Sequence, residues 1–256
     1  MILAVDIGNT NIVIGGIDAG AITFEARMAT DRVKTSDQYT AELYNILLLF
    51  HVDIAKIEGS IIASVVPPVL NSFKTAIRKL TGEYPLIVGP GIKTGLNIKT
   101  DFPAQTGSDL VAGSVAALHR YPLPAAIVDM GTATTIFVLD KSGAFIGGSI
   151  CPGVKISMDA LTSRTTLLPG ISLDTPKRAI GKNTIDCMQS GIMFGAAAMI
   201  DGIVDRMEEE LGEPIHLIIT GGIGKFVHPL MKHPASYDKD ILLQGLWDIW
   251  SLNQKQ

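Results

Sequence analysis

The chain has 256 residues, of which 47% are hydrophobic and 18% are charged, and its formal net charge at pH 7 is −4. This composition is typical of a folded globular protein and excludes a mainly disordered chain. The acidic balance gives no support to a nucleic-acid-binding role. Two cysteines, Cys151 and Cys187, do not suggest a disulfide framework, and the five histidines follow no recognised zinc-binding spacing.

The first part of the chain opens with short apolar runs separated by turn residues. Strands are predicted at residues 2–5, 12–17 and 22–28, which the tight turns between them arrange as an antiparallel meander. Apolar residues at helical spacing then predict a helix over 36–50, with Ser36 as its N-cap. The remaining predictions are strands at 61–66 and 86–88 and helices at 69–80 and 109–119.

The second part repeats this pattern after a proline-containing linker at 121–124. Strands are predicted at 125–128, 134–139 and 144–150, followed by a helix over 191–211 and a strand at 215–219. The apolar stretch 191–204 contains an aspartate and is too short to span a bilayer, so no membrane partner is expected. The N-terminus lacks the positive start and long apolar core of a secretory signal, which favours a cytoplasmic location.

The return of the strand pattern after residue 124 is an internal repeat. Asp6 and Gly8 recur as Asp129 and Gly131, each 123 residues later and each at the end of a short apolar strand. Two such units predict an α/β fold with two similar domains, residues 1–120 and 121–256. We expect an ATP cleft between the domains, lined by both Asp-x-Gly turns.

The turn at 6–11 carries residues suited to phosphate. Glycine permits close backbone approach, and asparagine and threonine add side-chain donors to the backbone N–H groups. A carboxylate at the start of the turn can hold Mg²⁺ through water. An ordinary hairpin turn has a similar composition, but its repetition at 129–134 favours a two-sided phosphate clamp.

Three other segments leave their interpretation open. Asp109 is predicted to be either a helix cap or a general base that takes a proton from an attacking hydroxyl. Gly221-Gly222 is either a tight strand–helix turn or a contact for the adenosine side of the nucleotide. Lys177, Arg178 and Lys182 form either a solvated basic loop, which is the favoured interpretation, or an anion-recognition site.

Taken in order, these segments resemble the acetate and sugar kinase, Hsp70 and actin superfamily, and more narrowly type III pantothenate kinase. The resemblance covers nearly the whole chain and implies two actin-like domains with mixed sheets flanked by helices. Its ordered marks are Asp6-Ile7-Gly8-Asn9-Thr10-Asn11, Ser64-Val65-Val66-Pro67, Gly89-Pro90-Gly91, Thr94-Gly95-Leu96, Asp129-Met130-Gly131-Thr132-Ala133-Thr134, Pro152-Gly153, Ser157, Ala160-Leu161, Thr184, Met188-Gln189-Ser190-Gly191 and Thr220-Gly221-Gly222.

The resemblance implies ATP-dependent phosphorylation of pantothenate on its primary hydroxyl, the first step of coenzyme A biosynthesis. It implies Asp109 as the catalytic base, Asp129 as the ligand of K⁺ or NH₄⁺, Asp6 as the ligand of Mg²⁺ through water, and a homodimer as the assembly. Pantothenate is then expected to contact Gly107, Ser108, Asp109, Leu110 and Thr184. ATP is expected to contact Asp6, Ile7, Gly8, Asn9, Thr10, Asn11, Ile12, Val13 and Thr132.

Two positions depart from the family pattern: Leu110 stands where the family usually has Arg, and Thr100 where it often has Tyr. The loss of one charged contact costs about 1.5–3 kcal/mol, or roughly 10- to 150-fold in substrate recognition. Three interpretations therefore stay open: an active pantothenate kinase, a non-catalytic nucleotide-binding paralogue that acts as a regulator or accessory factor, and a kinase of the same fold with a different acceptor.

Overall fold

The computed structural model describes residues 1–254 and groups the chain into two compact units. The first unit comprises Met1–Leu96, Asp101–His119 and the C-terminal segment from Asp240, and the second comprises Asn97–Thr100 and Arg120–Lys239. The chain passes into the second unit next to the expected boundary at residue 120. The C-terminal segment, placed with the second domain on sequence grounds, instead groups with the first unit.

The first unit is built on a five-stranded mixed sheet in the order β3-β2-β1-β4-β5. The first three strands form the predicted antiparallel meander, while β1 pairs with β4, and β4 with β5, in parallel. The strands are β1 (Ile2–Ile7), β2 (Asn11–Asp18), β3 (Ala21–Ala29), β4 (Gly59–Ser64) and β5 (Leu86–Ile87). The helices are α1 (Ser36–Leu49), α2 (Pro67–Thr81), α3 (Ser108–Arg120) and α7 (Ile241–Gln254), with short 3₁₀ turns at η1 (Ile54–Lys56) and η2 (Pro103–Gln105).

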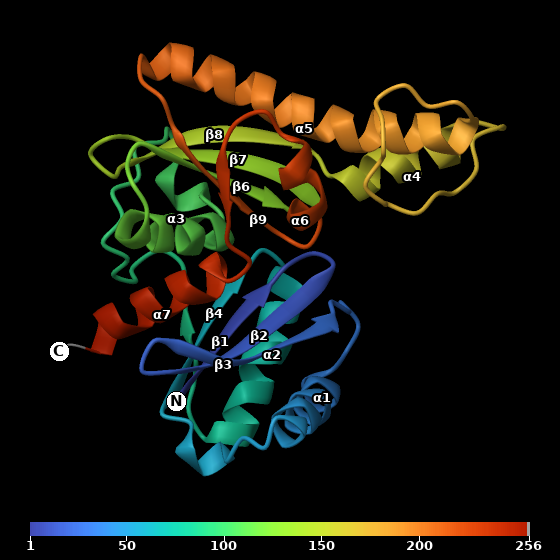
Figure 1. Cartoon of the computed structure of the whole chain (residues 1–256). Coiled ribbons are helices and arrows are strands. Elements are labelled where there is room, and N and C mark those ends of the chain that lie inside the picture. The colour runs from blue at the N-terminus through green and yellow to red at the C-terminus, as the bar shows by residue number, and fades with distance from the viewer. Residues whose placement is uncertain (255–256) are drawn as a thin grey trace. The chain divides into compact units, whose positions relative to one another are not determined.

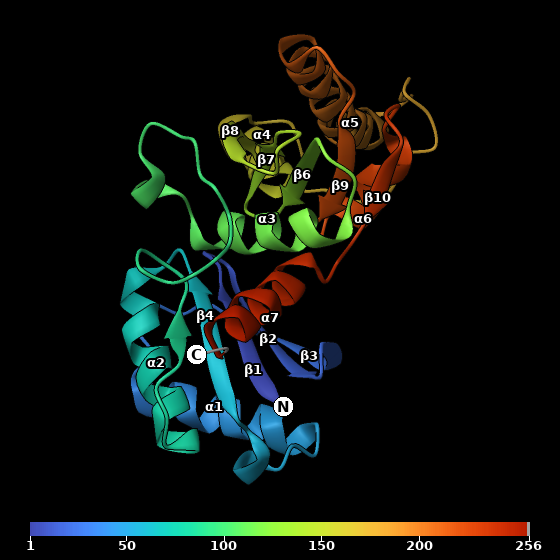
Figure 2. The same ribbon diagram turned by 90° about the vertical axis from the view of Figure 1, so that its left-hand side faces the viewer.

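Alternate residues of β1 face the two sides of this sheet, as the period of a strand requires. Leu3, Val5 and Ile7 pack in one core cluster with apolar residues of α1 and α2. The opposite face is covered by α7, which packs on β1 and β4, and Figure 2 shows α7 and α2 on opposite sides of these strands. Both faces of β1 and β4 are therefore largely buried, whereas the edge strand β3 is partly exposed.

The second unit repeats the same sheet, in the order β8-β7-β6-β9-β10 (Figure 1). Each pairing has the same sense as its counterpart, with antiparallel β6-β7 and β7-β8 and parallel β6-β9 and β9-β10. The predicted internal repeat is therefore confirmed as a repeat of topology. The strands are β6 (Ala125–Met130), β7 (Ala133–Leu139), β8 (Phe145–Pro152), β9 (His216–Thr220) and β10 (Ala235–Tyr237).

The repeat offset changes from 123 to 122 within the first hairpin turn of each unit. In the first unit the Gly8 N–H donates to the carbonyl oxygen of Asn11, whereas in the second unit the Gly131 N–H donates to that of Ala133. The first turn is therefore one residue longer. The irregularities in register further along, at Gly16/Ile17 and at Val138/Leu139, accordingly lie 122 residues apart.

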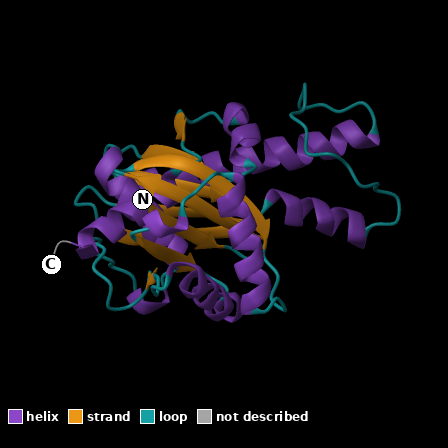
Figure 3. Cartoon of the chain, turned by 90° about the horizontal axis from the view of Figure 1, so that it is seen from below, coloured by secondary structure: helices purple, strands orange, loops and turns teal. Residues whose placement is uncertain are grey.

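The helices of the second unit are α4 (Val154–Arg164), α5 (Thr184–Leu211) and the short α6 (Gly224–Val227), which leads into η3 (His228–Leu230). Residues 165–183 form a loop without regular secondary structure between α4 and α5 (Figure 3). The 28-residue α5 is longer than the apolar stretch identified in the sequence. It contains an apolar window of 18 residues with a mean hydropathy of 1.4, which by length and composition would suffice to cross a membrane. Half of that apolar window is buried inside the protein, and Ile192, Met193 and Ala197 belong to the core cluster of the unit.

Several local predictions need correction. The N-cap of α1 is Thr35, not Ser36, because the Thr35 hydroxyl accepts from the Gln38 N–H and the Gln38 side chain returns a bond to the Thr35 N–H in a capping box. Proline is tolerated at the first helical position, so α2 begins at Pro67 and not after the proline pair. Helices α4 and α7 and strand β10 were not predicted.

Candidate active site

The first Asp-x-Gly turn joins β1 to β2. Asp6 is half-buried near the end of β1, and Asn9, Thr10 and Asn11 are exposed in the turn. The segment after β3 braces the turn, because the Thr30 hydroxyl donates to the Gly8 carbonyl oxygen at 2.6 Å and the Thr30 N–H donates to that of Thr10 at 3.0 Å. Backbone N–H groups and short polar side chains are thus held together at an open strand end, an arrangement suited to phosphate oxygens.

Two of the residues expected at this turn have buried side chains. Ile7 and Ile12 are both 0% exposed and belong to the core cluster beneath the sheet. They face each other across the β1-β2 hairpin, where they are partners in register. Any contact that these two residues make with ATP is therefore restricted to their backbone groups.

The start of α3 is tied to the same edge of the sheet through two serines. The Ser108 hydroxyl donates to the Ser64 carbonyl oxygen at 3.1 Å and accepts from the Ser64 N–H at 2.7 Å. Ser64 ends β4 and is the register partner of Ile7 at the end of β1. The first turn of α3 and the turn that follows Asp6 therefore stand at the carboxyl ends of adjacent parallel strands, where ligands of α/β sheets commonly bind.

Asp109 lies in this first turn of α3, one residue after Ser108. Its Oδ1 accepts the Leu110 N–H at 2.8 Å. Burial raises the pKa of Asp109 above its ordinary value of 3.8, and the backbone hydrogen bonds from Leu110 and Asp109 lower it by less. A Cβ atom on Gly107 would stand 2.5 Å from Asp109 Oδ1, so the glycine leaves the space that the carboxylate occupies. A desolvated carboxylate of raised pKa is suited to general-base work.

The two positions that depart from the family pattern lie in different units. Leu110 is half-buried in α3. The Thr100 hydroxyl oxygen is shielded from solvent and has no hydrogen-bond partner among the described residues.

In the second unit, three glycine-containing loops meet around the turn after β6. Gly221 has a left-handed backbone with φ of 86°, and a Cβ atom there would stand 2.6 Å from the Met130 carbonyl oxygen and 2.7 Å from Asp129 Oδ1. A Cβ atom on Gly153 would collide with the carbonyl oxygen of Thr132. Since Gly153 is the N-cap of α4, the positive end of this helix lies beside the exposed Thr132.

These contacts settle the local conformation of the Gly221-Gly222 pair. The Gly224 N–H donates to the Gly221 carbonyl oxygen at 3.2 Å, which closes a tight turn between β9 and α6. The atoms closest to Gly221 belong to Met130 and Asp129 at the end of β6. Gly221-Gly222 thus forms a tight strand–helix connection, and the Met130 carbonyl oxygen and Asp129 Oδ1 both lie close to Gly221; a contact with the adenosine side of a nucleotide stays a prediction.

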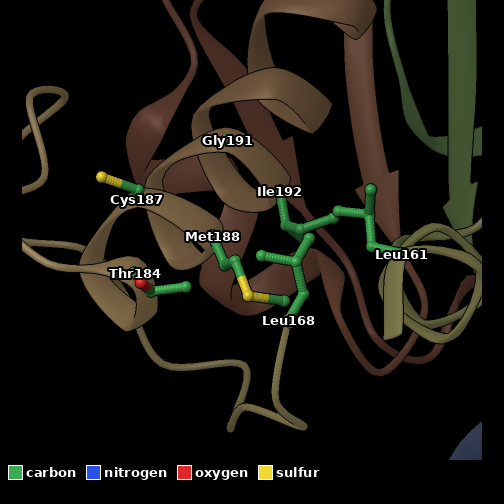
Figure 4. Close-up of a pocket in the computed structure, with 7 residues that line it drawn as sticks. All are labelled: Leu161, Leu168, Thr184, Cys187, Met188, Gly191 and Ile192. Carbon is green, nitrogen blue, oxygen red and sulfur yellow. The ribbon is translucent and has the colours of Figure 1, made fainter. Parts of the chain in front are cut away.

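Thr184 lies away from these turns, as the first residue of α5. Asn183 caps the helix by accepting the Asp186 N–H at 2.9 Å, which leaves Thr184 at the rim of an open hollow of about 550 Å³. Figure 4 shows the hollow between the side chains of α4, α5 and the loop. Its lining is mainly apolar: Leu161, Leu168, Thr184, Cys187, Met188, Gly191 and Ile192. Lys177, Arg178 and Lys182 are exposed in the neighbouring loop.

Sequence reasoning did not single out Thr30 or Arg32. The Arg32 guanidinium donates to Asn9 Oδ1 at 3.1 Å and so places a cation on the first phosphate turn. Neither residue belongs to a recognised motif, and both reach the turn only because β3 pairs with β2. The residue pattern of one segment cannot reveal a contact that forms only when β3 pairs with β2.

Comparison with known proteins identifies the family. The type III pantothenate kinase family model matches residues 2–206. The type III pantothenate kinase of Exiguobacterium sp. is 41% identical over 255 residues, covering 100% of both chains, and that of Moorella thermoacetica is 39% identical over 253 residues, covering 99% of this chain and 100% of the relative.

Solved structures show the fold. A Campylobacter jejuni protein assigned to a Baf transcriptional-activator family aligns with a TM-score of 0.62 at 20% identity, covering 100% of both chains. MreB 5 of Spiroplasma citri, bound to AMPPNP, aligns with a TM-score of 0.60 at 11% identity, covering 99% of this chain and 97% of that one. The expected class, two actin-like domains with mixed sheets flanked by helices, is confirmed. With the repeated sheets, both Asp-x-Gly turns and full-length relatives at about 40% identity, the chain belongs to the type III pantothenate kinase family.

Proposed function

We propose that this chain transfers the γ-phosphoryl group of ATP to the primary hydroxyl of pantothenate and forms 4′-phosphopantothenate and ADP. Membership of the family supports the reaction. The observation that carries the assignment of roles is the double hydrogen bond between Ser64 and Ser108, because it brings the Asp109 turn to the strand edge that carries the Asp6 turn.

In this mechanism Asp109 accepts the proton of the pantothenate hydroxyl as its oxygen bonds to the γ-phosphorus. The bond from the γ-phosphorus to the bridging oxygen breaks, and ADP leaves with that electron pair. Burial suits Asp109 to the task, because a raised pKa makes the ionised carboxylate a stronger base. Leu110 assists through its backbone, since its N–H fixes the carboxylate.

The turn from Asp6 to Val13 would hold the ATP phosphates through its backbone N–H groups and the side chains of Asn9, Thr10 and Asn11, and Arg32 would add a cation. Thr132, which lies beside the N-terminus of α4, would also contact ATP. We assign pantothenate contacts to Gly107 and Leu110. Thr184 lies away from these residues along the chain, and we propose that its contact with pantothenate is made across the homodimer proposed below, by the other copy of the chain. Ser108 supports the pocket structurally, because its hydroxyl already bonds Ser64.

The acids at the two strand ends fit the cations that the family resemblance implies. Asp6 offers a hard oxygen donor beside the phosphate turn and would hold Mg²⁺ through water. Asp129 Oδ1 and the Met130 carbonyl oxygen both approach Gly221, so Asp129 would hold K⁺ or NH₄⁺ among oxygen ligands. Bound Mg²⁺ would supply positive charge that neutralises the β- and γ-phosphates.

We further propose a cytoplasmic homodimer. Apolar side chains are exposed on α4, on α5 and on the loop between them, and burial in a subunit interface would remove them from water. They are Ile156, Leu161, Leu167, Ile180 and Ile185, with exposed fractions between 38% and 88%. Light scattering on the purified chain tests the assembly.

The reaction is tested by measuring ADP release with Mg-ATP, pantothenate and K⁺, with mass-spectrometric detection of the phosphorylated product. The same assay with Na⁺ in place of K⁺ tests the role of Asp129. Turnover that requires pantothenate and K⁺ supports the proposal.

Leu110 cannot supply the charged contact of the Arg that is usual at this position. It therefore favours, as a second candidate, a chain that binds ATP but does not use pantothenate, either a same-fold kinase with a different acceptor or a nucleotide-binding regulator. ATP binding without turnover on pantothenate would decide for this second candidate.

A further inference from the structure

A cluster of one imidazole and three carboxylates lies on the C-terminal half of α5, and the proposed kinase reaction does not use it. Asp201, Asp205 and Glu208 follow each other at intervals of four and three residues, which places them on one face of the helix. His233, from the segment before β10, lies against this face. Its Nδ1 is 3.0 Å from Asp201 Oδ1, and its Nε2 is 3.3 Å from Asp205 Oδ1 and 3.9 Å from Glu208 Oε2.

Asp201 orients the imidazole. It is buried, with 7% exposure, and accepts the backbone N–H groups of Lys232 at 2.9 Å and His233 at 3.0 Å. Asp201 Oδ1 lies 3.0 Å from His233 Nδ1, and a carboxylate at this position favours the tautomer with the proton on Nδ1, as in the carboxylate–histidine–metal arrangement.

That tautomer directs the lone pair of His233 Nε2 toward two further carboxylates. Glu208 is held in place because its Oε1 accepts the Ile215 N–H at 2.8 Å, which leaves Oε2 for the cluster. Three electron-pair donors facing one another repel unless a cation lies between them. That cation is either a proton on Nε2 or a metal ion.

We propose that Asp205, Glu208 and His233 bind one divalent metal ion of the zinc class, with Asp201 as the residue that positions the imidazole. The ligand atoms lie within 4.8 Å of one another. Bond lengths of about 2.0–2.2 Å place tetrahedral ligand atoms about 3.3–3.6 Å apart, close to the 3.3 Å between Nε2 and Asp205 Oδ1 and slightly shorter than the 3.9 Å to Glu208 Oε2. Water completes the coordination.

The donor set distinguishes this site from a magnesium site. Imidazole nitrogen suits Zn²⁺ and its neighbours in the transition series, whereas Mg²⁺ is bound through carboxylates and water. The ligands come from α5 and from a segment that begins more than twenty residues after the end of the helix. A bound ion would therefore fasten the connection between η3 and β10 to α5 and stabilise the second unit.

The test uses the full-length chain, freed of metal by a chelator and titrated with Zn²⁺ alone by calorimetry. We expect one equivalent to bind, and the Tm to rise by about 5–10 °C at a Zn²⁺ concentration 100-fold above the Kd. Substitution of Co²⁺ should give visible absorption from a coordinated imidazole. Mg²⁺ at the same concentration should not compete.

Variants locate the ion. His233→Gln and Asp205→Asn should each weaken Zn²⁺ binding at least tenfold, and Asp205 is exposed, so its variant is expected to fold normally. Glu209→Gln changes an exposed carboxylate next to the cluster and should bind Zn²⁺ like the wild type. Equal Zn²⁺ affinity in the wild type and in both cluster variants would overturn the proposal, as would the absence of one-equivalent binding, which would assign the cation to a proton on Nε2.

Discussion

Asp109→Asn is the most direct test of the proposed chemistry, because it removes the proton-accepting charge and keeps the shape of the side chain. The Asn oxygen can still accept the Leu110 N–H, so the first turn of α3 keeps its conformation. General-base catalysis contributes about 10²- to 10⁴-fold, equivalent to roughly 2.7–5.4 kcal/mol of the barrier. We therefore expect kcat to fall by that factor, while the Kd for ATP stays near the wild-type value.

Asp109→Asn is expected to lower kcat but to raise the stability of the folded chain at neutral pH. Because burial holds the pKa of Asp109 above 3.8 in the folded chain, the folded state binds this proton more tightly than the unfolded state does. This stabilising contribution is present at low pH and is lost as the pH rises through the folded-state pKa. Asp109→Asn should accordingly have a higher Tm than the wild type at pH 7, and the difference should shrink toward pH 4.

Two further variants make the result interpretable. Asp101→Asn removes an exposed carboxylate near α3 and should change neither kcat nor Tm. Gly107→Ala keeps the Asp109 carboxylate but adds a Cβ atom 2.5 Å from the present position of Oδ1. The displaced base should lower kcat by up to about 100-fold. Wild-type turnover in Asp109→Asn would refute the reasoning and leave Asp109 with a structural role only; that role is not the predicted helix cap, because Asp109 is the second residue of α3 and accepts the N–H of its neighbour Leu110.

Three other predictions concern recognition, the second turn and a helix cap. Leu110→Arg should lower the KM for pantothenate by about 10- to 150-fold if the pocket only lacks the charged contact; a higher KM would show a differently built pocket. Gly221→Ala should lower the Tm by about 2–8 °C, because alanine costs roughly 1–2 kcal/mol in the left-handed region. The variant should also need a higher K⁺ concentration for activity, since its Cβ would meet Asp129 Oδ1. Unchanged K⁺ dependence would argue against Asp129 as the K⁺ ligand. Thr35→Ala should cost about 1 kcal/mol by removing the capping box without altering kcat, as thermal unfolding and the kinase assay can show.

The sequence was most informative where it repeats. The recurrence of Asp6 and Gly8 as Asp129 and Gly131 predicted two strand meanders, and both sheets have the same strand order and the same pairing senses. Short, almost uninterrupted apolar runs located β1 and β6 in the sequence. They occur because both faces of these two strands are packed.

Features that depend on distant contacts could not be predicted in the same way. Helix α7 was not predicted, and nothing in its sequence indicates which sheet it covers; it packs on β1 and β4. Likewise, His233 looked isolated because its partners lie on α5, about thirty residues earlier. In both cases the chain connection is long, and only the packing decides which segments meet.

The position of Leu110 bears on the choice between an active kinase and a regulator. The atom of residue 110 that holds the Asp109 carboxylate is the backbone N–H, which any residue other than proline supplies. Replacement of the usual Arg therefore leaves the base in place, with Gly107 still providing its space and Ser108 still tying the helix to β4. A chain that had lost catalysis would have no need of this support for a half-buried carboxylate whose pKa is raised by desolvation. In the proposed mechanism, Leu110 would change how the acceptor is recognised, while the Asp109 carboxylate and the link from Ser108 to Ser64 stay in place.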